Sequence, residues 1–375
     1  MRELSSFVRP VVLASKKYNL DRFTLRREEF LEMDANENPF PPTPGVLRAM
    51  TETTPRLNRY PLLENPELRA KIASFVSLKA DNVLVSDGSL PLIDLIMSTF
   101  IDPDDEAILP LPTYTPYETR LISRGGKPVY VDPKPNFMWD IEGIKNAVTS
   151  RTKLIIIVSP NNPTGAAISE SDLKEVLNEG YITVVDEAYF LFGDQDFAHL
   201  VPQEKNLIIA RTFSKAFGLA GLRLGYAISS EELIHYMLQM KVGWIDSITA
   251  RLAEVALDDI GYVKENVRRI VEGRKYLFDE LSRIDGLRPF PSESNAILIR
   301  IEADLTGPEI MSTLRDQYHI LVREMTNFTG LGDKYFRITV GTMQQNMQTI
   351  AAVKKAVRTK RITPNARQNA LSRST

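Results

Sequence analysis

Residues 154–165 read Leu-Ile-Ile-Ile-Val-Ser-Pro-Asn-Asn-Pro-Thr-Gly. The segment begins with an aliphatic run, Leu154–Val158, in which most side chains are β-branched. A run without polar interruption predicts a strand that is buried on both faces, as in the parallel sheets of α/β proteins. The polar, proline-rich residues that follow would then lie at the carboxyl end of the strand, where open α/β sheets bind their ligands.

Strands and helices are predicted to alternate on either side of this segment. The strands are expected at residues 82–85, 107–111, 128–131, 154–158, 182–185 and 207–210. The helices are expected between them, at residues 66–76, 90–100, 114–124, 141–148 and 169–178. Such alternation indicates an α/β domain with a mostly parallel sheet.

The remaining sequence predicts a second, smaller unit. A long helix at 264–283 is followed by mixed strands and short helices, a pattern typical of an α+β domain. We therefore expect a large α/β domain at residues 45–255 and a small domain formed by residues 1–44 and 256–358. Residues 359–375 are polar and basic without an apolar period, and we expect a loosely held tail there.

Composition excludes several classes of protein. Of the 375 residues, 43% are hydrophobic and 25% are charged, as in an ordinary globular protein, and the net charge of −2 gives no reason to expect a nucleic-acid partner. The chain has no cysteine, and its three histidines, His199, His235 and His319, have no metal-ligand spacing, so we expect no metal site. No stretch is long and apolar enough to cross a membrane, and the N-terminus lacks the layout of a signal peptide. We expect a cytoplasmic protein.

Polar clusters follow four of the predicted strands and should meet at one edge of the sheet. They are residues 86–89, 159–165, 186–189 and 211–218. In the first cluster, Gly88 and Ser89 precede a helix, whose free N–H groups and positive dipole end suit a phosphate. Thr212 and Arg223 can add a hydroxyl and a guanidinium to the same phosphate site.

Two further residues of these clusters point to a cofactor. Asp186 ends a buried strand, where a carboxylate needs a cationic partner, and a protonated pyridine nitrogen would serve. Lys215 lies among apolar residues, which would lower its pKa and make it nucleophilic toward carbonyls. Taken alone, such an aspartate is more often a cap and such a lysine is usually solvated. Their occurrence together, beside a phosphate site, favours a pyridoxal-phosphate (PLP) site.

The same residues resemble those of a known family. Residues 159–165, 186–189 and 212–215, together with Arg223, are similar to motifs of the class I and II, fold-type I, PLP-dependent aminotransferases. The resemblance extends over residues 30–358 and is strongest to the histidinol-phosphate aminotransferases, through the segments 34–40, 58–61, 214–223 and 336–342. It implies a large domain with a mostly parallel, seven-stranded sheet and a homodimeric transaminase that uses PLP.

The resemblance also implies roles around the cofactor ring. Lys215 would bind the cofactor covalently as a Schiff base and later move a proton between Cα and C4′. Asp186 would keep the pyridine nitrogen protonated. Tyr189 and Asn162 would hydrogen-bond the ring's phenolate oxygen, and Tyr114 would stack on the ring.

Anion-binding roles follow from the same resemblance. The cofactor's phosphate would be held by Gly88, Ser89, the backbone N–H of Leu90, Thr212, Ser214 and Arg223. Tyr60 would reach the phosphate of the other subunit, which makes the dimer the active unit. Arg337 would bind the carboxylate of glutamate or the phosphate of the second substrate. Arg323 would assist with that phosphate, and Asn162 would also contact substrate.

Two departures from the subfamily leave the substrate open. Leu90 and Pro91 stand where the subfamily usually has Asp-Glu, and its N-terminal substrate-binding tyrosine has only Tyr18 as a loose counterpart. The expected acceptor is therefore imidazole-acetol phosphate or a 2-oxo acid, with glutamate as donor. An aromatic aminotransferase and a decarboxylase of a phosphorylated amino acid are the alternatives. A PLP-binding DNA regulator is disfavoured, because about 30 residues precede the match, too few for a helix-turn-helix module.

Overall fold

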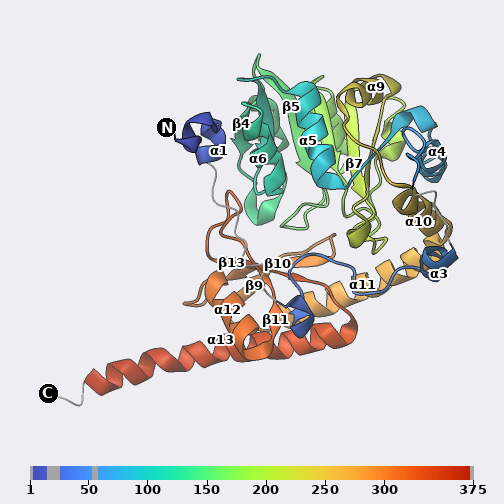
Figure 1. Ribbon diagram of the computed structural model, residues 1–375. Helices are drawn as coiled ribbons and strands as arrows, with labels where there is room; N and C mark the ends of the chain where they lie inside the picture. The colour runs from blue at the N-terminus through green and yellow to red at the C-terminus, as the bar shows by residue number, and fades with distance from the viewer. Residues whose placement is uncertain (1–2, 15–25, 53–57, 372–375) are drawn as a thin grey trace.

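A seven-stranded sheet forms the larger part of the computed structural model, which describes residues 3–14, 26–52 and 58–371, with side chains up to residue 358 (Figure 1). The strand order is β2-β8-β7-β6-β5-β3-β4. The strands are β2 (Val83–Ser86), β3 (Glu106–Pro110), β4 (Lys127–Val131), β5 (Thr152–Val158), β6 (Ile182–Asp186), β7 (Leu207–Thr212) and β8 (Gly225–Ser229). Only β8 runs antiparallel to its neighbours, so the predicted mostly parallel sheet is confirmed.

Helices cover both faces of this sheet, which explains the uninterrupted apolar strands. One face packs against α5 (Ser89–Phe100), α6 (Thr115–Ser123) and α9 (Glu231–Met240) (Figure 1). The other packs against α4 (Pro66–Phe75), α7 (Ile141–Asn146), α8 (Glu170–Leu177) and α10 (Ser247–Asp258). Successive residues of β5 alternate between the two cores: Ile155 and Ile157 face one, Leu154 and Ile156 the other.

A smaller antiparallel sheet, in the order β12-β13-β10-β9, lies beyond the carboxyl ends of the large sheet. Its strands are β9 (Leu287–Pro289), β10 (Ala296–Ile301), β12 (Arg323–Glu324) and β13 (Tyr335–Thr339). Its helices are α11 (Ile260–Leu281), α12 (Gly307–Tyr318) and α13 (Met343–Leu371). The N-terminal strand β1 (Leu31–Glu32) pairs in parallel with β11 (Ile320–Leu321), so the start of the chain joins this part. The exact domain limits stay a prediction.

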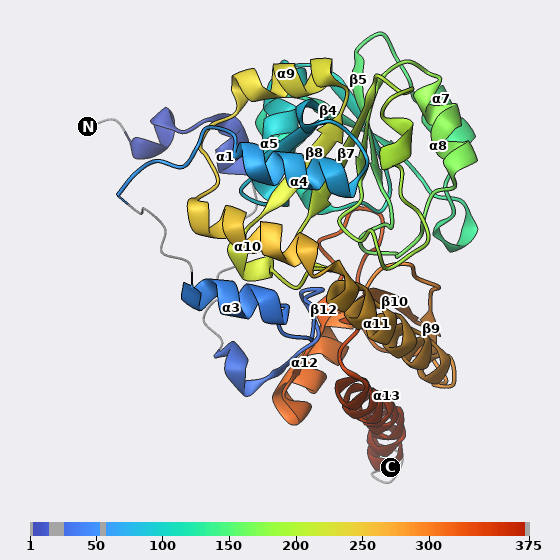
Figure 2. The ribbon, with the colours of Figure 1, turned by 90° about the vertical axis from the view of Figure 1, so that its right-hand side faces the viewer.

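The described residues also form several short elements. They are the helices α1 (Pro10–Ala14) and α3 (Pro44–Glu52) and the 3₁₀ turns η1 (Leu4–Phe7), η2 (Arg27–Glu29), η3 (Ala80–Asn82), η4 (Pro135–Phe137), η5 (Ala198–Leu200) and η6 (Ala220–Leu222). Figure 2 shows α3 and α10 side by side, and their residues are in contact.

Three features differ from the sequence predictions. Strand β8 and the helices α9 and α10 were not predicted. Helix α13 continues to Leu371, so most of the segment expected to be a loose tail extends a helix (Figure 1). The sequence also suggests Asn65 as the N-cap of the helix that begins at Pro66, but its backbone is left-handed and its side chain donates to the carbonyl of Ile245 instead of capping α4.

Candidate active site

A cavity of about 420 Å³ opens where the carboxyl ends of the large sheet meet the small sheet. It brings together most of the predicted site residues: Ser89, Leu90, Tyr114, Asn162, Asp186, Tyr189, Thr212, Ser214, Lys215, Arg223, Arg323 and Arg337. Tyr60 lies outside it, 86% exposed, with its ring edge-on to Trp244. Tyr18 falls outside the described residues.

Asp186 is a fully buried carboxylate at the end of β6. Burial raises its pKa to about 6, and hydrogen bonds from the Ala188 N–H and the Tyr117 hydroxyl, with the charge of Lys215, oppose this rise. The two hydrogen bonds are both 2.9 Å long and come from neutral donors. A carboxylate so placed is costly unless a cation neutralises it. The arrangement suits a protonated ring nitrogen.

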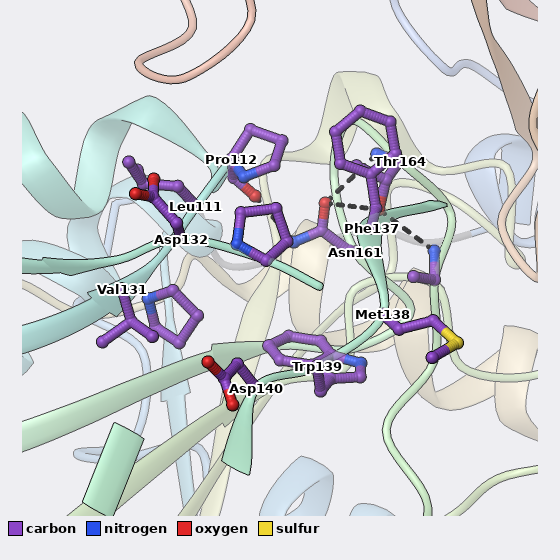
Figure 3. A pocket seen from close by; sticks show the side chains of 13 residues that line it. Leu111, Pro112, Val131, Asp132, Phe137, Met138, Trp139, Asp140, Asn161 and Thr164 are labelled. Carbon is purple, nitrogen blue, oxygen red and sulfur yellow. Dashed lines mark hydrogen bonds between the residues drawn. The ribbon is translucent and has the colours of Figure 1, made fainter. Parts of the chain in front are cut away.

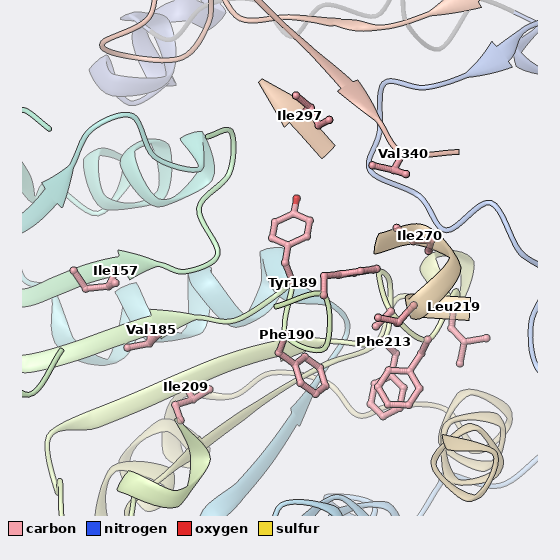
Figure 4. Close-up of a cluster of buried hydrophobic side chains, with 14 of the residues drawn as sticks. Ile157, Val185, Tyr189, Phe190, Ile209, Phe213, Leu219, Ile270, Ile297 and Val340 are labelled. Carbon is pink, nitrogen blue, oxygen red and sulfur yellow. The ribbon is translucent and has the colours of Figure 1, made fainter. Parts of the chain in front are cut away.

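Lys215 extends from the loop after β7 into the cavity. Its Nζ donates to the carbonyl of Ala35 at 3.0 Å. The Asn38 amide donates to the carbonyls of Lys215 and Ala216, at 3.2 and 3.0 Å, so the N-terminal segment holds the lysine loop in place. Phe213, the first residue of this loop, is buried in the hydrophobic cluster drawn in Figure 4. The backbone of Lys215 is therefore held in place, and its Nζ is the polar atom that reaches the cavity.

Tyr189 and Asn162 are each oriented by a side chain from elsewhere in the sequence. The Tyr189 hydroxyl accepts a 2.8 Å hydrogen bond from the amide of Asn36, and burial raises the pKa of this tyrosine. Asn162 accepts a hydrogen bond from the guanidinium of Arg337, which also donates to the Asp34 carbonyl at 2.9 Å. The residues 34–36 therefore link the large sheet to the small one.

A phosphate-sized cradle forms at the N-terminus of α5. Gly88 has φ +100°, a backbone conformation that favours glycine, and a Cβ there would lie 2.8 Å from the tip of the Arg223 guanidinium. The hydroxyl of Thr212 accepts from the Ser214 N–H at 3.0 Å, which turns the chain after β7 toward the cradle. The N–H groups of a helix start, two hydroxyls and a guanidinium are the usual ligands of a phosphate.

Arg323 and Arg337 face each other across neighbouring strands. They are register partners in the antiparallel pair β12–β13, and both line the cavity. Two guanidinium groups on one side of a cavity form a strong binding site for a carboxylate or phosphate. Tyr114, at the start of α6, also lines the cavity, and burial raises the pKa of its hydroxyl to about 12.

A buried ion pair supports the site from the opposite face of the sheet. Arg211, next to Thr212, donates from Nε to the carboxylate of Glu187 at 2.8 Å and lies 4.2 Å above the Phe190 ring. Tyr189 points toward the small sheet, while Phe190 points the other way (Figure 4), and only Tyr189 of the two lines the cavity. The pair thus ties the ends of β6 and β7 together directly beneath the residues that face the cavity.

A smaller pocket beside the site shows how two of its loops are joined (Figure 3). The Asn161 amide donates to the Pro112 carbonyl at 3.1 Å, and its oxygen accepts from the backbone and hydroxyl of Thr164. With a volume of about 10 Å³ the pocket has room for no more than one water molecule. Its role is to fix the loops that carry Asn162 and Tyr114.

Sequence reasoning missed several of these supporting residues. Tyr117, Glu187, Arg211 and Asn36 were assigned no role, although Asn36 and Glu187 lie in the segments that carry the family resemblance. Tyr117 follows Tyr114 by one helical turn, which was a usable signal that both face the site. In the part of the chain described, no cluster of acidic or histidine side chains could hold a metal ion, and no helix could span a membrane.

Comparison with known proteins identifies the class. Residues 28–353 match the family model "Aminotransferase class I and II". The chain therefore belongs to this family of PLP-dependent aminotransferases, and the predicted family, fold class, enzymatic activity and cofactor are confirmed.

Individual relatives point to one subfamily. The chain is 32% identical to the histidinol-phosphate aminotransferase of Methanocaldococcus jannaschii, over 92% of this chain and 94% of the relative. It is 36% identical to that of Methanosarcina barkeri, over 87% and 88%. The crystal structure of the Clostridium acetobutylicum histidinol-phosphate aminotransferase superposes with a TM-score of 0.81 at 26% identity, covering 88% of this chain and 99% of that one. The Sinorhizobium meliloti enzyme, solved in complex with pyridoxal-5′-phosphate, shares the fold, with a TM-score of 0.85 at 24% identity, over 94% and 98%.

The residues of the cavity fit the cofactor that this family uses. The Gly88 cradle, which a Cβ would fill, matches a phosphate, and the buried carboxylate of Asp186 matches a cationic ring nitrogen. Lys215 lines the same cavity as Asp186 and as Ser89 and Arg223 of the cradle, whereas Gly88 itself does not line it. These are three independent matches to one molecule.

Proposed function

We propose that this enzyme transfers an amino group between glutamate and imidazole-acetol phosphate, the reaction of a histidinol-phosphate aminotransferase. The observation that carries the proposal is the Arg323–Arg337 pair in the cavity that holds Lys215. Two adjacent guanidinium groups can bind the carboxylate of one substrate and the phosphate of the other. The names of the relatives support the same assignment.

Lys215 and Asp186 perform the central chemistry in this proposal. The bound cofactor supplies an electron sink for the bond broken at the substrate Cα. Lys215 would hold the cofactor and afterwards accept the Cα proton at Nζ, the atom that here donates to the Ala35 carbonyl. Asp186 keeps its negative charge toward the ring nitrogen, helped by Tyr117 and Ala188.

The other side chains bind and orient. Tyr189, oriented by Asn36, and Asn162, oriented by Arg337, would hydrogen-bond the ring oxygen of the cofactor. Tyr114 would cover the face of the ring. The cofactor's phosphate is assigned to the α5 cradle, to which Ser89, the Leu90 N–H, Thr212, Ser214 and Arg223 contribute along with Gly88. Arg337 binds the substrate anion and Arg323 assists it.

We also propose that the active unit is a cytoplasmic homodimer. Tyr60 does not line the cavity of its own chain and is highly exposed, together with its neighbours Leu62 and Leu63. Exposed apolar side chains in such a group favour burial against another protein surface. The partner subunit's Tyr60 would then complete the phosphate site, which sedimentation analysis and a Tyr60→Phe variant can test.

The substrate assignment is tested by product analysis. The purified enzyme with glutamate and imidazole-acetol phosphate should form 2-oxoglutarate and histidinol phosphate in equal amounts. Turnover of phenylalanine or tyrosine in place of histidinol phosphate would establish the aromatic alternative, which the apolar Leu90 in the cavity wall would favour. Release of CO2 from a phosphorylated amino acid would establish the decarboxylase.

A further inference from the structure

Residues 34–37 of the N-terminal segment line the cavity, and three of the four polar side chains of residues 34–38 have partners within the protein. Asp34 binds Arg27 at 2.7 Å, Asn36 binds the Tyr189 hydroxyl, and Asn38 binds the backbone of the lysine loop. The segment is thus held rigidly against both sheets. A side chain within it that has no such structural contact is in a fixed position to meet a ligand.

Glu37 is that side chain. It is exposed and lines the cavity, and among the described residues its carboxylate makes no hydrogen bond or ion pair. The cavity's two other carboxylates have assigned partners, since Asp34 binds Arg27 and Asp186 is buried at the cofactor site. Glu37 therefore carries the negative charge that this cavity presents to substrate.

We propose that Glu37 determines substrate specificity by binding an N–H group of the substrate side chain, namely the imidazole ring of histidinol phosphate. The proposal rests on the function proposed above and extends it. Arg323 and Arg337 account for the anionic groups of the substrates, but they give no reason to prefer an imidazole over a phenyl ring. A carboxylate does, because it accepts a hydrogen bond from an imidazole N–H and attracts the imidazolium form.

Glu37 would also explain why the site discriminates against other amino donors. A phenyl ring over Glu37 would remove water from the carboxylate without offering a donor, and sites built to hydrogen-bond a substrate discriminate strongly against analogues that lack the group. Glutamate brings a second carboxylate, which Glu37 would repel. Because the Glu37 side chain is exposed, it can turn toward solvent when glutamate binds, so this repulsion is expected to be small.

The test compares three amino donors in the wild-type holoenzyme, in Glu37→Gln and in Glu28→Gln. Glu28 is an exposed glutamate of the same N-terminal region that does not line the cavity, so it serves as the matched control. We expect Glu37→Gln to lower kcat/KM for L-histidinol phosphate at least tenfold, the equivalent of about 1.4 kcal/mol. For L-phenylalanine and L-glutamate, kcat/KM should stay within twofold or rise. Glu28→Gln should behave as wild type.

A binding measurement separates recognition from chemistry. In the Lys215→Ala background, loaded with cofactor, calorimetry should show that Glu37→Gln weakens histidinol phosphate binding about tenfold and leaves the binding of inorganic phosphate unchanged. An equal loss for all three donors, or no loss for histidinol phosphate, would overturn the role of Glu37. If the wild-type enzyme itself does not use histidinol phosphate, the proposed function fails, and the inference fails with it.

Discussion

Replacement of Asp186 by asparagine should stabilise the cofactor-free protein while it weakens cofactor binding. The carboxyl has a pKa of about 6 in the folded chain against 3.8 when unfolded, because burial disfavours its charge. The gap corresponds to about 3 kcal/mol of lost stability once the group is ionised. Asparagine has nearly the same shape, can accept one hydrogen bond through its oxygen and carries no charge.

The size of the effect depends on pH. Below pH 3.8 the carboxyl is protonated in both states, and no penalty exists. As pH rises through about 6, the folded wild type loses stability that Asp186→Asn keeps. The variant without cofactor should therefore be more stable than wild type by about 3 kcal/mol at pH 8 and almost equal to it near pH 4.

Denaturant unfolding of the cofactor-free proteins across this pH range measures the difference. The adjacent Glu187 provides the matched control, because it is also buried but is paired with Arg211. Glu187→Gln removes one of the two carboxylates that pair with the buried Arg211, the other being Asp196, and should destabilise the protein. A lower stability of Asp186→Asn than of wild type at pH 8, or a difference that does not change with pH, would refute the reasoning.

Three further changes have expected outcomes. Arg337→Ala should raise KM for glutamate about tenfold to a hundredfold, because a charge-assisted contact of about 1.5–3 kcal/mol is lost; an unchanged KM would place the anion elsewhere. Tyr117→Phe removes a donor from Asp186, which should raise the pKa of that carboxyl and weaken cofactor affinity about tenfold in equilibrium dialysis. Lys215→Ala should abolish transamination and the visible absorbance near ~420 nm, and normal turnover would contradict its role.

The sequence predicts the core of this fold well, because the central strands are buried on both faces. The apolar run Leu154–Val158 predicts a central strand, and the polar residues that follow it are then expected at the carboxyl edge of the sheet. Asp186 and Lys215 also follow predicted strands, so the sequence predicts that they meet at that edge. In the structure both residues line the same cavity. Strand β8 was not predicted because it is only five residues long. Its place in the sheet depends on antiparallel pairing with β2 and β7, which the local sequence does not reveal.

The supporting residues could not be predicted, because each acts across a long sequence separation. Asn36 orients Tyr189 from 153 positions away, and Arg211 meets Glu187 on the face of the sheet opposite to the cavity. From sequence alone, an arginine such as Arg211 at the end of an apolar strand is interpreted as a surface residue, because its buried partner Glu187 is not known. The continuation of α13 past residue 358 was also missed, since it has no apolar period to reveal it.

The identity of the lysine that holds the cofactor is the central claim and can be measured directly. The purified holoenzyme is reduced with borohydride, which fixes the cofactor to its lysine, and the modified peptide is located by mass spectrometry. We predict that the added mass lies on Lys215 alone. Modification of a different lysine, with Lys215 unmodified, would contradict the account of the site.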